Sequence, residues 1–234
     1  MKYFVILVIL SQNCLAQEWW IIPKVFVASR TFEYSVYNGN IKGNIYSIGG
    51  GLTGIYKDFY IDLFSERNIN TNEESIINGL RDTVEFERTD FTTTFGYAVN
   101  KSMSVFTGYK YGKSTLTELD FSPFYGAKTS LEGKGIFIGA GSGWRVEDWG
   151  TFSFSAAYAK LQASYDSFDL GLTKGDADGT SLSMKWKNAV TIIPNLYYQL
   201  AIIRHEYYYE DFKRINFDIS EQILSYHFGI SYQF

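Results

Sequence analysis

The C-terminal segment Tyr226–Phe234 alternates strictly between apolar residues and residues that are polar or small. The apolar positions are Tyr226, Phe228, Ile230, Tyr232 and Phe234, and the positions between them are His227, Gly229, Ser231 and Gln233. Successive side chains of a β-strand point to opposite faces. The segment therefore predicts a strand with one wholly apolar face and one polar face.

A chain that ends on such a strand, with its last aromatic residue in phase, resembles the C-terminal strand of Gram-negative outer-membrane β-barrels. The resemblance covers the whole mature chain at the level of this class and does not identify one member. It implies a location in the cell outer membrane, in contact with lipid and lipopolysaccharide. It also implies that Tyr232 and Phe234 form an insertion signal that the barrel-assembly machinery reads.

The N-terminus is consistent with export. Lys2 precedes an apolar run from Tyr3 to Leu10, and the polar segment Ser11–Ala16 ends on a small residue. This order predicts a secretory signal peptide, residues 1–16, followed by a barrel domain, residues 17–234. The apolar run is too short to span a bilayer, which takes about 20 residues.

Cys14 offers an alternative to simple cleavage, because a lipoprotein signal would acylate this residue. Gln12 and Asn13 before it are bulky and polar, where that signal has small residues. Cys14 is the only cysteine. Cleavage after Ala16 therefore leaves a mature chain without disulfide or thiol chemistry.

Composition favours a sheet that is apolar on one face. After the signal there is no apolar stretch near 18 residues, so no transmembrane helix is expected. The chain nevertheless has 19 Tyr, 19 Phe and 5 Trp, a content typical of transmembrane barrels with aromatic residues at both membrane interfaces. The net charge is −4 and no basic stripe is present, so nucleic acid is not expected as a partner. No cofactor and no metal are expected, because the calcium-loop-like segment Asp176–Gly179 lacks a closing Glu.

Alternating segments predict an all-β, transmembrane, antiparallel up-and-down β-barrel of about ten strands, with eight as the alternative. Tight turns are expected near residues 57–58, 100–101, 147–148 and 190–195. Long loops are expected at residues 65–82, 112–133 and 164–178. This alternation of short and long connections predicts that both termini lie on the periplasmic side. The apolar face of the first strand, about Val25–Tyr37, also carries Arg30, and a bulge near Ser29 would resolve that conflict.

The phase of these strands predicts which side chains face lipid and which face the lumen. The lipid-facing set includes Leu52, Phe95, Ile138, Phe154, Leu200 and Ile230. The charged and titratable side chains predicted to face the lumen are Asp62, Asp90, Lys110, Arg145, Lys185, Lys187, His205, Glu221 and His227. Two interpretations remain open: a salt-bridged, filled interior or a narrow hydrated channel. Small barrels of about 8 strands are just filled by side chains, which favours the former. Inward glycines near residues 49–51 and 139–143 either provide room or set curvature.

The favoured function is a porin-like or surface-exposed structural or binding protein without catalytic residues. The alternative is an outer-membrane hydrolase. If the last hairpin turns within residues 213–216, His205 lies opposite Ser225, with His227 diagonal and Glu221 beyond them. A nucleophile, a base and an acid within reach are the minimum for nucleophilic catalysis.

Two families of barrel enzymes bear on this alternative. The outer-membrane lipid A deacylases use a Ser–His–acid triad, but on the lipid-facing surface and with His-x-Ser spacing, whereas this chain has Ser225-x-His227. The strand number also resembles the omptin proteases, whose site combines acidic pairs with an Asp–His pair above the membrane. No matching motif is present, and the two histidines are interpreted as polar lumen residues.

Overall fold

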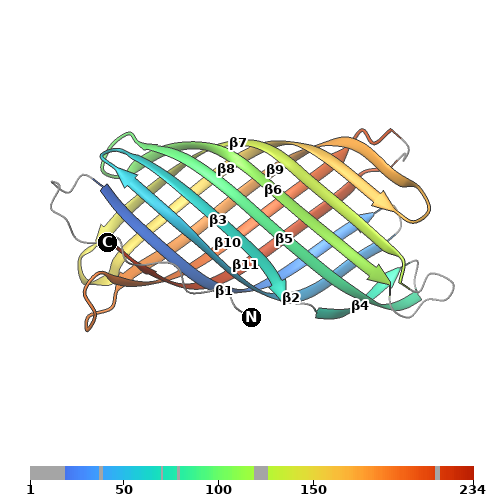
Figure 1. The fold of residues 1–234 in the computed structure, drawn as a ribbon, viewed down its shortest axis with the longest axis horizontal. Helices are drawn as coiled ribbons and strands as arrows, with labels where there is room; N and C mark the ends of the chain where they lie inside the picture. Colours follow the sequence, from blue (N-terminus) through green and yellow to red (C-terminus); the bar gives the residue numbers. More distant parts are fainter. Residues whose placement is uncertain (1–18, 37–38, 70, 78–79, 119–125, 214–216) are drawn as a thin grey trace, which may run out of the picture.

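The computed structural model describes residues 19–36, 39–69, 71–77, 80–118, 126–213 and 217–234 (Figure 1). The predicted signal peptide, residues 1–16, lies outside these described residues. The strands are β1 (Trp19–Val36), β2 (Gly39–Tyr56), β3 (Phe59–Ile69), β4 (Thr71–Ile77), β5 (Leu80–Ala98), β6 (Met103–Glu118), β7 (Lys128–Val146), β8 (Gly150–Ser167), β9 (Gly171–Ala189), β10 (Leu196–Glu210) and β11 (Ile219–Tyr232). A short 3₁₀ helix, η1 (Glu147–Trp149), joins β7 to β8. Among the described residues, no helix is long and apolar enough to cross a membrane.

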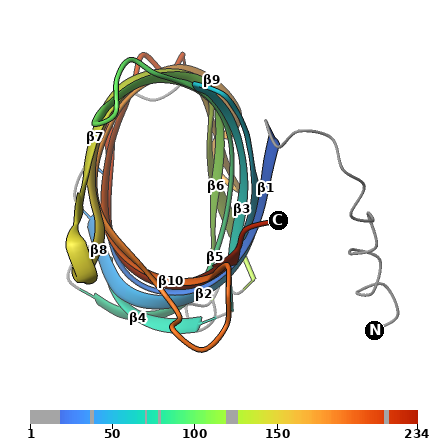
Figure 2. The same ribbon diagram turned by 90° about the vertical axis from the view of Figure 1, so that its left-hand side faces the viewer.

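The strands form one closed antiparallel ring. β1 pairs with β2 on one side and with β11 on the other, so the first and last strands close the sheet. β3 and β4 follow one another along the same position in the ring, between β2 and β5. The pairing with β5 shifts by one residue from β3, where Phe59 pairs with Tyr97, to β4, where Thr71 pairs with Phe86. The ring therefore has ten positions, and the predicted up-and-down barrel of ten strands is confirmed. Figure 2 looks along the barrel and shows an oval cross-section.

The barrel has two different ends, as the predicted connections require. The tight turns between β2 and β3, β5 and β6, β7 and β8, and β9 and β10 lie at one end. The described termini lie at the same end, where Phe234 N–H donates to Ile21 O at 3.0 Å and Gln233 N–H donates to Asn195 O at 2.9 Å. We call the half of the barrel next to these turns the turn half, residues 19–28 on β1. The half next to the other connections is the loop half, residues 29–36 on β1.

The outer face of the turn half is a continuous apolar belt. The belt has at least one exposed apolar side chain on every strand position of the ring, including Val25, Leu52, Ile61, Phe95, Val105, Ile138, Phe154, Leu182, Leu200 and Ile230. The predicted lipid-facing set is exposed on this surface, with Ile138 at 66%. About 9–11 tilted residues cross a bilayer, whereas most of these strands have 14–19, so the strands continue well beyond the belt.

In the loop half the two faces exchange character. On β8, the outward residues Lys160, Gln162 and Asp166 are polar and exposed, whereas the inward residues Leu161 and Tyr165 are buried. The inward side chains of this half pack into a hydrophobic core. The most deeply buried members of this core are Phe32, Ile45, Val84, Phe86, Ile219 and Ile223, each at most 1% exposed. The loop half is therefore a filled barrel with a polar exterior.

This exchange explains why the predicted long loops were wrong. β3 continues to Ile69 and is followed by β4, β6 continues to Glu118, and β9 begins at Gly171, all within segments expected to be loops. The prediction located each strand by apolar residues at every second position, taken to face outward. The outward residues of these segments are mostly polar, such as the exposed Arg67, Lys174 and Asp176, so the segments lacked the expected signal. Asp176–Gly179, expected to be a loop turn, likewise belongs to β9.

The first strand was also assigned wrongly. β1 begins at Trp19 and pairs residue for residue with β2 along its whole length, so the predicted bulge near Ser29 is absent. Val25 and Val27 are its exposed apolar residues, and Arg30 points inward with Phe32. The conflict arose because the apolar face that carries Arg30 also carries Phe32, which belongs to the core of the loop half and does not face lipid.

The two halves should respond differently to a new charge on the outer face of one strand. Phe154→Arg places a guanidinium within the apolar belt and should destabilise the folded barrel by about 2–4 kcal/mol. Gln162→Arg is the matched control on the outward face of the same strand in the loop half, and its effect should be small. Urea unfolding in lipid vesicles, followed by tryptophan fluorescence, measures both. Equal costs at the two positions would contradict the assignment of the belt.

Candidate functional site

A layer of buried charges lies inside the barrel, between the two halves. We call it the charge layer, and its members are Arg30, Glu66, Arg88, Asp90, Lys110 and Glu221. Arg88 is its centre: Nε and Nη2 donate to the two carboxylate oxygens of Asp90, each at 2.9 Å. Nη1 donates to Ser114 Oγ at 2.8 Å and to the Glu221 carboxylate.

The charge layer joins opposite walls of the barrel. Arg30 on β1 donates to Asp90 on β5 at 2.9 Å, although β2 and β3 lie between these strands in the ring. It also pairs with Glu66 on β3. On the other side, Lys110 Nζ of β6 lies 4.9 Å from the centre of the Tyr207 ring on β10. These contacts join strands that are not neighbours in the ring, so the charge layer spans the lumen.

The charges in this layer are balanced, and most of its buried polar atoms are paired, although Arg30 Nε has no hydrogen-bond partner among the described residues. Three cationic side chains meet three carboxylates, and hydroxyl groups satisfy further carboxylate oxygens. Ser114 Oγ donates to Glu221 at 2.7 Å, Tyr209 donates to the same carboxylate at 3.1 Å, and Ser47 donates to Glu66. Buried charges persist when they are paired and hydrogen-bonded in this way.

Sequence reasoning predicted Asp90, Lys110 and Glu221 as lumen residues but missed Arg30, Glu66 and Arg88. Glu66 and Arg88 lie in phase with Asp62 and Asp90, so the same alternation could have found them. The first was overlooked because a loop was expected from Ser65 onward, where the structure has the end of β3.

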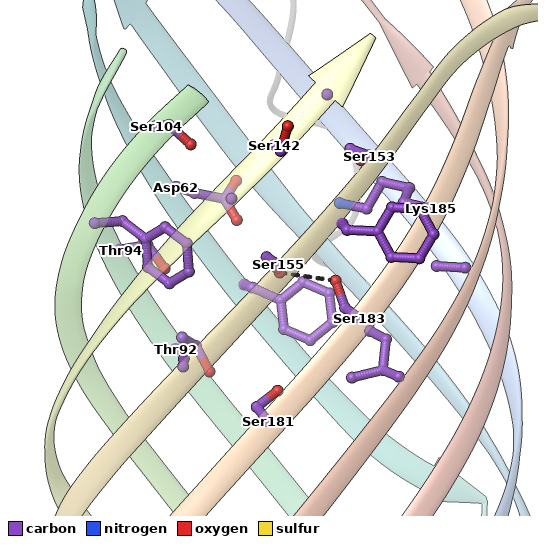
Figure 3. Close-up of a pocket in the computed structure, with 18 of the residues that line it drawn as sticks. Asp62, Thr92, Thr94, Ser104, Ser142, Ser153, Ser155, Ser181, Ser183 and Lys185 are labelled. Atoms are coloured by element: carbon purple, nitrogen blue, oxygen red, sulfur yellow. Dashed lines mark hydrogen bonds between the residues drawn. The ribbon is translucent and has the colours of Figure 1, made fainter. Parts of the chain in front are cut away.

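A cavity of about 1020 Å³ fills the inside of the turn half. The charge layer bounds it on one side, and its lining reaches the turn residues Asn100–Ser102 at the opposite end. Its lining includes the predicted lumen residues Asp62, Arg145 and Lys185. Figure 3 shows Asp62 and Lys185 among the lining residues. Lys187, also predicted for the lumen, lies with Nζ 4.1 Å from the centre of the Tyr197 ring.

The inward glycines near residues 49 and 139 do not enlarge this cavity directly. A Cβ on Gly49 would collide with the ring of Phe26, and a Cβ on Gly139 would collide with the ring of Phe106. Each glycine therefore provides room for an aromatic neighbour rather than for water.

The four residues of the catalytic alternative all point inward, but their pairing differs from the prediction. His205 pairs with Ile223, and Ser225 pairs with Ile203. The predicted register was wrong by two residues. Alternation determines which face a side chain takes, and a shift of two residues leaves every face unchanged. The pattern therefore could not distinguish the two registers.

The four residues do not form a nucleophile–base–acid chain in the described part of the protein. Ser225 Oγ and His205 Nδ1 are buried without hydrogen-bond partners. Glu221 is engaged by Arg88, Ser114 and Tyr209. His227 lines the cavity, and the centre of its ring lies 5.2 Å from the centre of the Phe26 ring.

The described residues contain no cluster of three or more His, Cys, Asp or Glu side chains that could hold a metal ion. The calcium-loop-like Asp178 instead accepts a hydrogen bond from Tyr158 at 2.6 Å and pairs with Lys160 at 3.4 Å on the outer face.

Comparison with known proteins gives matches at the level of structure. No family model and no curated protein sequence matches the chain. The outer membrane protease OmpT from Escherichia coli superposes with a TM-score of 0.59 and 11% identity, over 95% of this chain and 99% of that one. The chain has the fold of a Gram-negative outer-membrane β-barrel. At this identity the likeness concerns the fold, and the protease activity is a property of OmpT.

Two further outer-membrane proteins are more distant. Ail of Yersinia pestis, solved with the heparin analogue sucrose octasulfate, has a TM-score of 0.42 and 9% identity over 92% of this chain and 99% of that one. A FadL homologue of Pseudomonas aeruginosa has a TM-score of 0.40 and 9% identity over 92% and 90%. The apolar belt adds independent evidence to the fold, because only lipid makes a closed apolar exterior favourable. The barrel therefore has the fold of outer-membrane barrels and an outer surface suited to lipid.

The charge layer should dominate the stability of the interior. Arg88→Met leaves the carboxylate of Glu221 buried without its cation and should cost about 3–5 kcal/mol in the free energy of unfolding. Arg204→Met is the matched control, because Arg204 pairs with Glu206 on the exposed outer face and should contribute less than about 1 kcal/mol. Urea unfolding of both variants in the same vesicles measures the difference. Similar costs would mean that the charge layer does not brace the barrel.

Proposed function

We propose that the protein is a non-catalytic outer-membrane barrel, closed to ion flow, that holds its loop half outside the membrane as a structural or binding element. The observation that carries this proposal is the exchange of faces along the strands. A polar exterior around a packed apolar core is the construction of a water-exposed domain. Short turns of outer-membrane barrels lie on the periplasmic side, so the loop half, at the end opposite the tight turns, is assigned to the cell surface.

A continuous water path through the barrel would have to pass two obstacles. The charge layer crosses the lumen from wall to wall, and the core that includes Phe32, Phe86 and Ile223 follows it. These features favour a surface protein over an open porin within the earlier porin-like interpretation.

The hydrolase alternative has less support from the geometry. Its serine is fully buried, and its carboxylate is already bound by an arginine. Both histidines of the chain point into the barrel, so neither can form an Asp–His pair on the outer face of the loop half.

The expected surroundings are consistent with this assignment. Outer-membrane lipid and lipopolysaccharide would contact the apolar belt, and the barrel-assembly machinery would read Tyr232 and Phe234 during insertion. Tyr232 is the last residue of β11, and its ring centre lies 4.7 Å from that of Phe234, which is exposed.

Conductance in planar lipid bilayers tests whether the barrel is closed. Wild-type protein should show no steady ionic current. The quadruple variant Phe32→Ser, Phe86→Ser, Arg88→Ser and Ile223→Ser should conduct, because it removes both the core and the centre of the charge layer. Heat-modifiable migration on a denaturing gel must show that this variant remains folded. A steady current through the wild-type barrel would overturn the proposal that it is closed.

The catalytic alternative makes a separate prediction. If the protein is not a hydrolase, mass spectra of lipid A should be identical in cells with wild-type protein, with His205→Ala or Ser225→Ala, and without the protein. Surface peptides should likewise remain uncleaved in all four strains. A lipid A species or peptide fragment that depends on both His205 and Ser225 would establish the hydrolase instead, because a nucleophile and its base fail together.

A further inference from the structure

The cavity in the turn half has no role in a surface element that acts through the loop half. It is separated from that half by the charge layer, and its lining reaches the turns at the other end of the barrel. With a volume of about 1020 Å³ it lies at the upper end of typical ligand-site sizes, about 300–1,000 Å³.

The charges of the cavity do not cancel. On the turn-half side of the charge layer the lining has one carboxylate, that of Asp62. It accepts hydrogen bonds from Lys24 Nζ at 2.5 Å and from the Thr53 hydroxyl at 2.5 Å. Lys185 is also part of the lining, and within the described residues its ammonium group has no ion pair or hydrogen bond. An inward ammonium group without a carboxylate partner gives the cavity a surplus positive charge.

Hydroxyl groups line the same wall of the cavity as this ammonium group. Ser153 lies directly opposite Lys185 in the pairing of β8 with β9. On the next row Ser155 Oγ and Ser183 Oγ are joined by a hydrogen bond of 2.9 Å, and Ser181 follows on β9. Figure 3 shows this arrangement, with Ser153 and Lys185 on one side of the Ser155–Ser183 pair and Ser181 on the other. Hydroxyl and ammonium donors on one wall match the acceptor oxygens of an anion.

Aromatic rings supply the apolar part of the cavity. Phe26 and Phe64 stack with their centres 4.6 Å apart, and Phe106 and Phe137 contribute from β6 and β7. Ligand sites typically combine apolar walls with a few convergent polar groups.

We propose that this cavity is a binding site, entered from the turn end of the barrel, for a small organic oxyanion. Lys185 holds the anionic group, with Ser153 and the Ser155–Ser183 pair as hydrogen-bond donors. The body of the ligand lies against the phenylalanine rings. By the assignment of the turn end to the periplasm, the ligand arrives from the periplasmic side. The site does not depend on what the loop half binds, so either proposal can fail without the other.

Fluorine NMR of the full-length barrel in lipid nanodiscs tests the site with two probes of one shape. The anion 4-fluorobenzoate should bind saturably, and the neutral 4-fluorobenzamide should bind at least about tenfold more weakly, because an ammonium group discriminates by charge. Lys185→Gln should weaken benzoate binding at least about tenfold. Lys160→Gln, which removes an exposed lysine of the outer face, is the matched control and should leave binding unchanged. Equal binding of the two probes, or unchanged binding to Lys185→Gln, would overturn the proposal.

The positive electrostatic potential of the cavity can also be measured by a chemical reaction, which does not depend on the choice of ligand. Ser183→Cys introduces a thiol beside Lys185. It should react faster with the anionic 2-sulfonatoethyl methanethiosulfonate than with its cationic trimethylammonium analogue, relative to a small thiol in solution. Adding Lys185→Gln should reduce this preference at least about tenfold, whereas adding Lys160→Gln should not. A preference that is absent, or that survives the loss of Lys185, would contradict an anion site.

Discussion

The structure depends on one constraint, which is that each face of the barrel wall must match the medium it meets. In the turn half the outer face meets lipid, so the outward side chains are apolar. In the loop half the outer face is polar, and the apolar side chains turn inward instead. Backbone groups in lipid must be bonded internally, and a closed barrel meets this requirement at every strand. Closure therefore comes from the backbone, while the character of each half comes from which face is apolar.

The charge layer lies where the apolar side chains change faces. At that level the interior passes from a cavity lined with hydroxyl groups to a dry core. Ion pairs between non-neighbouring strands connect β1 with β5 and β11 with β5, so they fix the width of the lumen at one level. An isolated buried charge would be costly, but Arg30, Glu66, Arg88, Asp90 and Glu221 are linked by shared ion pairs, and Lys110 lies over the Tyr207 ring. The same bonds that cross the lumen therefore also hold its walls together.

Much of the fold could be predicted from the sequence, and the errors have one origin. The belt residues Phe95, Ile138 and Ile230 were predicted because apolar residues at every second position indicate a lipid-facing strand. The same rule failed for β4 and for the outer ends of β6 and β9, where the alternating apolar residues point inward. It also failed for β1, because the apolar Val25 points outward in the turn half, whereas the apolar Phe32 points inward in the loop half. The charge layer was found only in part for this reason, and the pairing of His205 with Ile223 was beyond reach because alternation specifies a face and not a register.

The difference between cavity and core can be followed along a single strand. The inward residues of β8 are Ser153, Ser155 and Ala157 in the turn half, and Leu161 and Tyr165 in the loop half. The diameter of a barrel follows from its strand number and tilt, so the space inside changes little along its length. Small inward side chains must then leave space, and large ones must fill it. A barrel of nearly constant diameter therefore encloses two different interiors. At one end is a cavity lined by hydroxyl groups and an unpaired lysine, and at the other end is a packed core. The chemistry of the interior is set by side-chain size as much as by charge.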